Sequence, residues 1–149
     1  MRMIDDKLSG RVIGLAIHVH RRFGPGLLES VYETFLCAEL EGTGIPFVRQ
    51  APIAAEHNGR RVDLAFRADL IVANELIVEI KSVEALAPVH EAQLLTYLRL
   101  SGCRVGLLLN FNTVVLTQGL RRFANTLGRT GRVPSVVRPF VSRGDRGGR

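Results

Sequence analysis

The sequence predicts an α/β domain in which a mixed β-sheet is flanked by helices. Apolar residues recur at helical spacing in the first part of the chain, and β-branched runs separated by tight turns follow. A further helical stretch then separates these runs from later strands, as in a sheet covered by helices. We expect the order helix, helix, four strands, helix, two strands. The 149 residues suffice for one domain with a sizeable core, which we assign to residues 1–127.

Two helices are predicted at the start of the chain. Residues 24–26 read Gly-Pro-Gly, which ends the first helix, and a second helix is expected from about residue 27 to residue 40. This helix should end near Gly42 and Gly44, because glycine permits the left-handed cap. The apolar positions that indicate the first helix, within residues 4–23, are Leu8, Val12, Leu15, Val19 and Phe23.

The middle of the chain is predicted to be extended. Residues 47–56 and 60–66 flank Asn58-Gly59, the strongest short signal for a β-hairpin. Residues 70–72 and 76–80 flank a second tight reversal at Ala73-Asn74. We then expect a helix over about 88–100, closed by Gly102, and a buried strand over 104–110. The last predicted elements are a strand over 114–117 and a short helix over 119–127.

The distribution of charge, the cysteines and the hydropathy of the chain indicate its cellular location and its C-terminal segment. Residues 121–149 hold eight Arg and one acid, whereas residues 1–120 carry 12 basic and 13 acidic groups. We predict a flexible Arg/Gly-rich tail over 128–149, which either holds phosphates or is solvated without a partner.

Cys37 and Cys103 lie in apolar surroundings, as expected for buried, reduced thiols. With no signal-like start and no run of about 18 apolar residues, we expect a cytoplasmic protein that does not contact membranes.

The stretch from Asp69 to Lys81 holds the residues best suited to chemistry. Glu79 and Lys81 are two apart on a predicted strand and therefore project to the same face, while Val78 and Ile80 face the core. Asp69 lies on the paired strand and can approach Glu79. Two carboxylates at the edge of an apolar sheet repel each other, and a divalent cation relieves this. Alternatively, the three side chains form a cross-strand salt bridge on a solvated face.

The chemistry of this set suits phosphodiester hydrolysis. Mg²⁺ prefers hard oxygen ligands and retains water, so two carboxylates and a backbone carbonyl suffice, and Mn²⁺ accepts the same ligands. Lys81 could orient or deprotonate an attacking water and balance phosphate charge. Only two of the 20 basic residues are Lys, namely Lys7 and Lys81, which hints that a compact ammonium group is needed at residue 81.

Two predicted helices carry further polar residues. Gln93 and Tyr97 share one face of the third helix, with His90 one turn earlier; the alternative is that they lie at the margin of the core. On the second helix, Glu29 shares a face with Tyr32 and Glu33. Glu29 could be a third metal ligand, or it could lie in the first turn because the helix dipole favours an acid there.

Together these motifs resemble the GxxExxY family of the PD-(D/E)XK nuclease superfamily, near its RecB-like and lambda-exonuclease-like branch. The resemblance covers roughly residues 5–125 in the same order, and every motif residue is present. The motifs are Gly26-x-x-Glu29-x-x-Tyr32, Asp69-Leu-Ile, Glu79-Ile-Lys81, Gln93-x-x-x-Tyr97 and Gly106-Leu-Leu-Leu-Asn110-Phe111.

The resemblance implies a restriction-endonuclease-like sheet with a metal site at its open edge. Asp69 and Glu79 would be metal ligands, together with the Ile80 carbonyl, and Lys81 would be the catalytic lysine. Glu29 would be the helix-borne acid that completes the catalytic and metal-binding set. Supporting roles at the site or on the nucleic acid would fall to Gln93, Tyr97, Tyr32 and His90.

The expected function is a Mg²⁺-dependent nuclease, with Mn²⁺ as a possible substitute, that hydrolyses phosphodiester bonds of DNA in repair, defence or a mobile element. RNA stays open as a substrate. The alternative is a non-catalytic module on the same fold that binds nucleic acid or protein, because fold does not guarantee function. A homo-oligomer or a partner protein is a third possibility.

Overall fold

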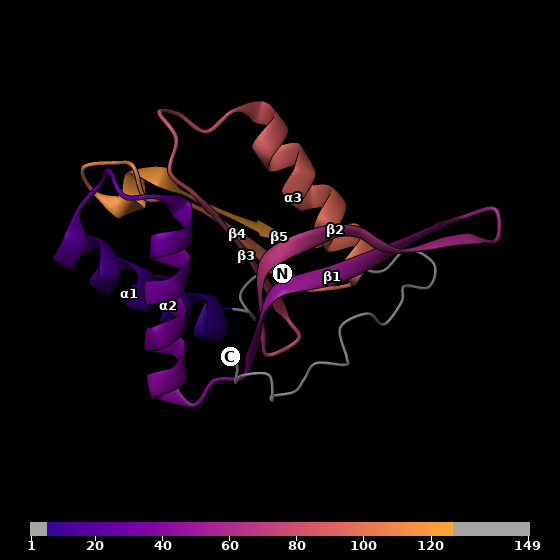
Figure 1. The fold of residues 1–149 in the computed structure, drawn as a ribbon, viewed down its shortest axis with the longest axis horizontal. Coiled ribbons are helices and arrows are strands. Elements are labelled where there is room, and N and C mark those ends of the chain that lie inside the picture. The colour runs from indigo at the N-terminus through magenta and orange to yellow at the C-terminus, as the bar shows by residue number, and fades with distance from the viewer. Residues whose placement is uncertain (1–5, 127–149) are drawn as a thin grey trace.

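The structure is a computed structural model that describes residues 6–126 (Figure 1). The predicted tail at residues 128–149 lies outside the described residues. In chain order the elements are α1 (Asp6–Phe23), α2 (Glu29–Thr43), β1 (Phe47–His57), β2 (Arg60–Val72), β3 (Leu76–Lys81), α3 (Pro88–Ser101), β4 (Val105–Asn110), the 3₁₀ helix η2 (Leu116–Gly119) and β5 (Leu120–Ala124).

The strands form one mixed sheet in the order β1-β2-β3-β4-β5, which confirms the predicted fold class. Neighbouring strands are antiparallel except β3 and β4, which are parallel and are joined through α3. A parallel pair needs such a crossover, because its strands start at the same end of the sheet. Helices α1 and α2 cover one face and α3 covers the other, while the β1–β2 hairpin extends beyond the rest of the sheet (Figure 1).

Each face of the sheet buries its own apolar cluster. On the α1/α2 face the cluster includes Val12, Leu36, Leu70, Val78, Ile80 and Phe111. On the α3 face it includes Ile53, Ile71, Ile77, Leu94, Leu98 and Leu108. Consecutive residues of β2 and β3 thus alternate between the two clusters, as a strand that is covered on both faces requires.

The predicted turns and helix ends are confirmed where glycine or asparagine marked them. At the hairpin, Asn58 and Gly59 have φ of 50° and 78°, the left-handed pair that a two-residue hairpin turn needs. Gly44 and Gly102 end α2 and α3 with φ of 80° and 77°. Cys37 and Cys103 are buried and free, as expected. None of the helices in residues 6–126 is long and apolar enough to span a membrane.

Three predictions of secondary structure are wrong. The runs 60–66 and 70–72 are not separate strands but parts of one continuous β2, because β1 pairs with β2 from His57↔Arg60 to Phe47↔Val72. The predicted strand at 114–117 is a bend that leads into η2, with Val114 84% exposed. These residues reverse the chain after β4, and a reversal leaves no neighbouring strand to pair with.

The third error is the short helix predicted over 119–127, where the chain forms β5 instead. Leu120 and Phe123 are three apart, which suits one face of a helix. In the structure they lie on opposite faces, Leu120 against the α1/α2 cluster and Phe123 against the α3 cluster. β5 supplies backbone partners to the edge of β4, so a tertiary contact overrides the local pattern.

Candidate active site

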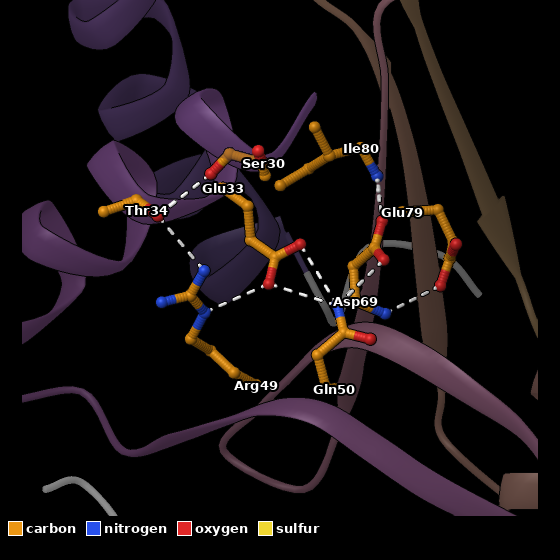
Figure 2. A network of polar contacts seen from close by, with 8 residues as sticks. All are labelled: Ser30, Glu33, Thr34, Arg49, Gln50, Asp69, Glu79 and Ile80. Carbon is orange, nitrogen blue, oxygen red and sulfur yellow. Dashed lines mark hydrogen bonds and ion pairs between the residues drawn. The ribbon is translucent and has the colours of Figure 1, made fainter. Parts of the chain in front are cut away.

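The candidate site lies where β2 and β3 diverge. The two strands pair only over Leu70–Val72 and Leu76–Val78; beyond this, β2 continues with β1, and β3 with β4. Asp69 and Glu79 occupy the fork and replace the missing backbone contacts. The Asp69 N–H donates to Glu79 Oε2 at 3.0 Å, and the Ile80 N–H donates to Asp69 Oδ2 at 2.8 Å (Figure 2). The two predicted acids therefore lie together.

Burial makes this pair of carboxylates unfavourable without a cation. Glu79 is only 8% exposed. Burial raises the pKa of Glu79 to about 8, and repulsion from Asp69 adds to the rise. Burial also raises the pKa of Asp69, against the hydrogen bond from the Ile80 N–H and the positive charge of Lys81. A positive charge at the fork would favour the ionised form of both groups.

The donor set of the fork suits Mg²⁺ or Mn²⁺. Within residues 6–126, Glu79 Oε1 accepts no hydrogen bond. The N–H and C=O of a strand residue point to the same side, so the Ile80 carbonyl points toward the fork, as its N–H does. In the described chain no three His, Cys, Asp or Glu side chains are grouped to hold a metal ion. Mg²⁺ would therefore have to keep several waters at this site, as it commonly does.

Lys81 ends β3 on the same face as Glu79, as predicted, and is partly buried. The Phe111 N–H donates to the Lys81 carbonyl at 2.9 Å, which ties this strand end to the end of β4. Lys81 forms no salt bridge with another residue of 6–126, so the outward pair with Glu84 is not formed. Its positive charge acts on Asp69 and Glu79 instead and opposes part of the rise in the pKa of each.

Glu29, the predicted helix-borne acid, is exposed at the start of α2. Its Oε2 accepts a hydrogen bond from the Ser82 N–H at 3.0 Å, and the Ser82 hydroxyl donates to the Leu27 carbonyl at 2.8 Å. These contacts join the α2 N-terminus to the residue that follows Lys81. In the structure Glu29 therefore holds the loop after β3, and its role as a metal ligand stays a prediction.

Glu33, a second acid of α2, acts electrostatically on Asp69 and Glu79, although it is absent from the predicted ligands. Glu33 is 7% exposed, and its charge contributes to the raised pKa of both Asp69 and Glu79. It accepts hydrogen bonds from Arg49 Nε at 3.0 Å and from Gln50 Nε2 at 3.2 Å, and Gln50 Nε2 also lies 3.3 Å from Asp69 Oδ1 (Figure 2). In the sequence, Glu33 is marked only by its position one helical turn after Glu29.

The polar residues of α3 divide into two groups. Tyr97 stacks on Phe66 of β2 with ring centroids 3.5 Å apart, and burial followed by the charges of Glu79 and Asp69 raises the pKa of its hydroxyl. Tyr97 thus lies beside the site, and Gln93, one turn earlier, is exposed. His90 Nδ1 accepts from the Ala87 N–H at 2.9 Å, so this imidazole caps the N-terminus of α3.

Tyr32 is buried in the core on the α1/α2 face of the sheet. Its ring is fully buried and stacks on Phe111 with centroids 4.4 Å apart. Its hydroxyl donates to the Gly24 carbonyl and accepts from the Leu27 N–H. Both partners belong to the connection between α1 and α2, so Tyr32 fixes the loop that leads into Glu29. These contacts are structural, and the predicted support of the site or the nucleic acid by Tyr32 stays a prediction.

A mixed five-stranded sheet flanked by helices, with an acidic pair and a lysine where two strands diverge, is a restriction-endonuclease-like fold. The family model described as the PD-(D/E)XK nuclease superfamily matches residues 6–123. The chain therefore belongs to the PD-(D/E)XK nuclease superfamily, whose members are generally nucleases. Searches of curated proteins and of solved structures found no match.

Proposed function

We propose that this chain is a divalent-metal-dependent nuclease that hydrolyses phosphodiester bonds of DNA. The observation that carries the proposal is the buried pair Asp69 and Glu79 at the β2–β3 fork, with Lys81 on the same face as Glu79. Burial raises the pKa of both acids, and a neighbouring carboxylate adds to each rise, Glu33 for Asp69 and Asp69 for Glu79, so both acids gain from a cation. Such perturbed pairs occur preferentially at functional sites.

In this proposal each residue has a separate role. Asp69, Glu79 and the Ile80 carbonyl hold Mg²⁺ or Mn²⁺, with Glu29 as a further acid, direct or through water. When bound, the cation neutralises charge on the phosphate and makes water a better nucleophile. Lys81 orients or deprotonates the attacking water and balances phosphate charge. On α3, Gln93 and Tyr97 contact the DNA strand or steady the site.

The finer classification rests on the motifs. Gly26 in the loop before α2, and Glu29 and Tyr32 at the start of α2, have the spacing of the GxxExxY family. The contacts of Glu29 and Tyr32 join this segment to the loop after β3 and to the connection between α1 and α2. We therefore assign the chain to that family and to the RecB-like and lambda-exonuclease-like branch. A cytoplasmic role in repair, defence or a mobile element is part of the same proposal.

A non-catalytic module on the same fold is the second candidate, and two observations favour it. With a pKa of about 8, Glu79 stays largely protonated at neutral pH in the absence of a cation, and the described residues offer no group of three metal-binding side chains. A fold that had lost its metal could keep such a protonated pair. Metal binding by the purified protein separates the two candidates.

The test is incubation of the purified full chain with end-labelled single-stranded DNA, double-stranded DNA and RNA, in Mg²⁺, Mn²⁺ or EDTA. We expect DNA cleavage in either metal and none in EDTA, with the products showing attack from an end or within the strand. Cleavage of RNA alone would correct the substrate. Failure to cut any substrate, together with failure to bind Mn²⁺, would favour the non-catalytic module.

A further inference from the structure

Gln50 adopts an unusual backbone conformation directly opposite Asp69. Its neighbours in β1, Arg49 and Ala51, pair with Leu70 and Ala68 of β2, and this register places Gln50 across from Asp69. The φ of Gln50 is 51°, in the left-handed region that is unfavourable for residues with a Cβ. Residues held in a strained backbone conformation occur preferentially at functional sites, which directs attention to the contacts of the Gln50 side chain.

The side-chain amide of Gln50 lies between two carboxylates that come from different elements. Gln50 Nε2 is 3.2 Å from both Glu33 Oε1 and Glu33 Oε2, and 3.3 Å from Asp69 Oδ1. An amide oxygen in this place would face three carboxylate oxygens and be repelled, so the NH₂ group must point there. Figure 2 shows the amide between the two acids. Gln50 thus separates Glu33 from Asp69 and donates to both.

The amide is itself held in place through Glu33. Arg49 Nε donates to Glu33 Oε2 at 3.0 Å, and another nitrogen of its guanidinium donates to the Thr34 hydroxyl at 3.2 Å. Glu33 is therefore fixed between a guanidinium and an amide, at 7% exposure. A continuous chain of contacts runs from Arg49 through Glu33 and Gln50 to Asp69 (Figure 2).

The consequence falls on the orientation of the Asp69 carboxylate. Its Oδ2 is fixed by the Ile80 N–H, and its Oδ1 is fixed by Gln50. Without the amide, Oδ1 would lose its donor, and the negative charge of Glu33 would face Asp69 with nothing between them. The carboxylate would then turn about its bond to the chain, and the geometry at the fork would be lost.

We propose that Gln50 is a positioning residue, whose amide, fixed by Glu33 and Arg49, holds the Asp69 carboxylate in the orientation that binds the divalent cation. This inference rests on the proposed function and names residues that the predicted ligand set does not contain. Groups that orient a metal ligand typically contribute 10- to 100-fold in metal affinity, so the effect is measurable without any cleavage assay.

Gln50→Gly is the variant that tests the proposal. Glycine accepts the left-handed conformation without strain, so a residue needed only for its backbone shape would be fully replaced by it. We expect the variant to remain folded, because relief of backbone strain offsets part of the loss of the amide contacts, yet to bind Mn²⁺ about 10- to 100-fold more weakly in calorimetric titration. Gln50→Asn is a second variant for the same Mn²⁺ titration. Asn tolerates this φ and keeps the amide, but its side chain is one methylene too short to contact both acids.

Asn58→Gly is the matched control, because Asn58 has a φ of 50° at the hairpin tip and makes none of these contacts. It should bind Mn²⁺ like the unmodified chain. Equal Mn²⁺ affinity of the unmodified chain, Gln50→Gly and Gln50→Asn would overturn the positioning role and leave the proposed nuclease intact. Absence of Mn²⁺ binding by the unmodified chain would instead overturn the proposed function, and this inference with it.

Discussion

Replacing Lys81 by Ala is expected to lower the rate of DNA cleavage by about 10²- to 10⁴-fold, the usual contribution of a positioned acid or base. Lys81 lies on the face of Glu79, and its charge acts on both carboxylates of the fork. Mn²⁺ binding should persist in the variant, because the proposed ligands are oxygen atoms of other residues. Single-turnover cleavage and calorimetric Mn²⁺ titration of the same preparation measure the two properties separately.

The sequence provides a matched control for this variant. Lys7 is the only other lysine, and it lies exposed on α1. Lys7→Ala removes the same charge from the chain and should cleave DNA at the unmodified rate. Full cleavage by Lys81→Ala would refute the proposed role of Lys81, whereas an equal loss in both lysine variants would point to general electrostatic attraction of DNA.

Thermal stability in EDTA is expected to fall as the pH rises from about 5 to about 8. The pKa of Glu79 is about 8 in the folded chain against an ordinary value of 4.5, so between these values the folded state binds more protons than the unfolded state. Stability then decreases with increasing pH across this window and levels off above it. The raised pKa of Asp69 acts in the same direction.

Divalent cations should reverse this loss. Mn²⁺ or Mg²⁺ binds the ionised carboxylates, so it should raise the melting temperature more near pH 8 than near about pH 5. Glu79→Gln should flatten the pH dependence and remove the cation effect. Asp63→Asn, at an exposed carboxylate paired with Arg61, should change neither. A melting temperature that rises with pH in EDTA, or a pH slope in Glu79→Gln like that of the unmodified chain, would contradict the account.

Local signals were sufficient for most of the fold. Asn58-Gly59 and the glycines at residues 44 and 102 mark turns whose backbone conformations few other residues adopt, and all are confirmed. The end of the sheet was not predictable in this way. Leu120 and Phe123 suit a helix in isolation, and only the free edge of β4 makes them a strand. The long pairing of β1 with β2 likewise joins two runs that look separate.

In the candidate site, too, the contacts set by local sequence could be predicted, and those set by tertiary packing could not. The contact between Asp69 and Glu79 follows from strand periodicity and a short hairpin, so it could be predicted. Glu33 and Gln50 come from elements whose approach depends on tertiary packing, and neither belongs to a recognisable motif. Periodicity places Glu29 and Glu33 on one face of α2 but does not say which one reaches the fork. The structure connects Glu33 to Asp69 through Gln50, and Glu29 to Ser82.

The most direct test of the central claim is cleavage of labelled single- and double-stranded DNA by the unmodified chain and by Glu79→Ala, each in Mg²⁺, Mn²⁺ and EDTA. Glu79 is the most buried acid of the fork, and its replacement removes one proposed ligand and the hydrogen bond to the Asp69 N–H. The account predicts metal-dependent cleavage by the unmodified chain and none by a folded Glu79→Ala. Metal-dependent cleavage of equal rate by Glu79→Ala would contradict it, because the catalytic site would then lie elsewhere.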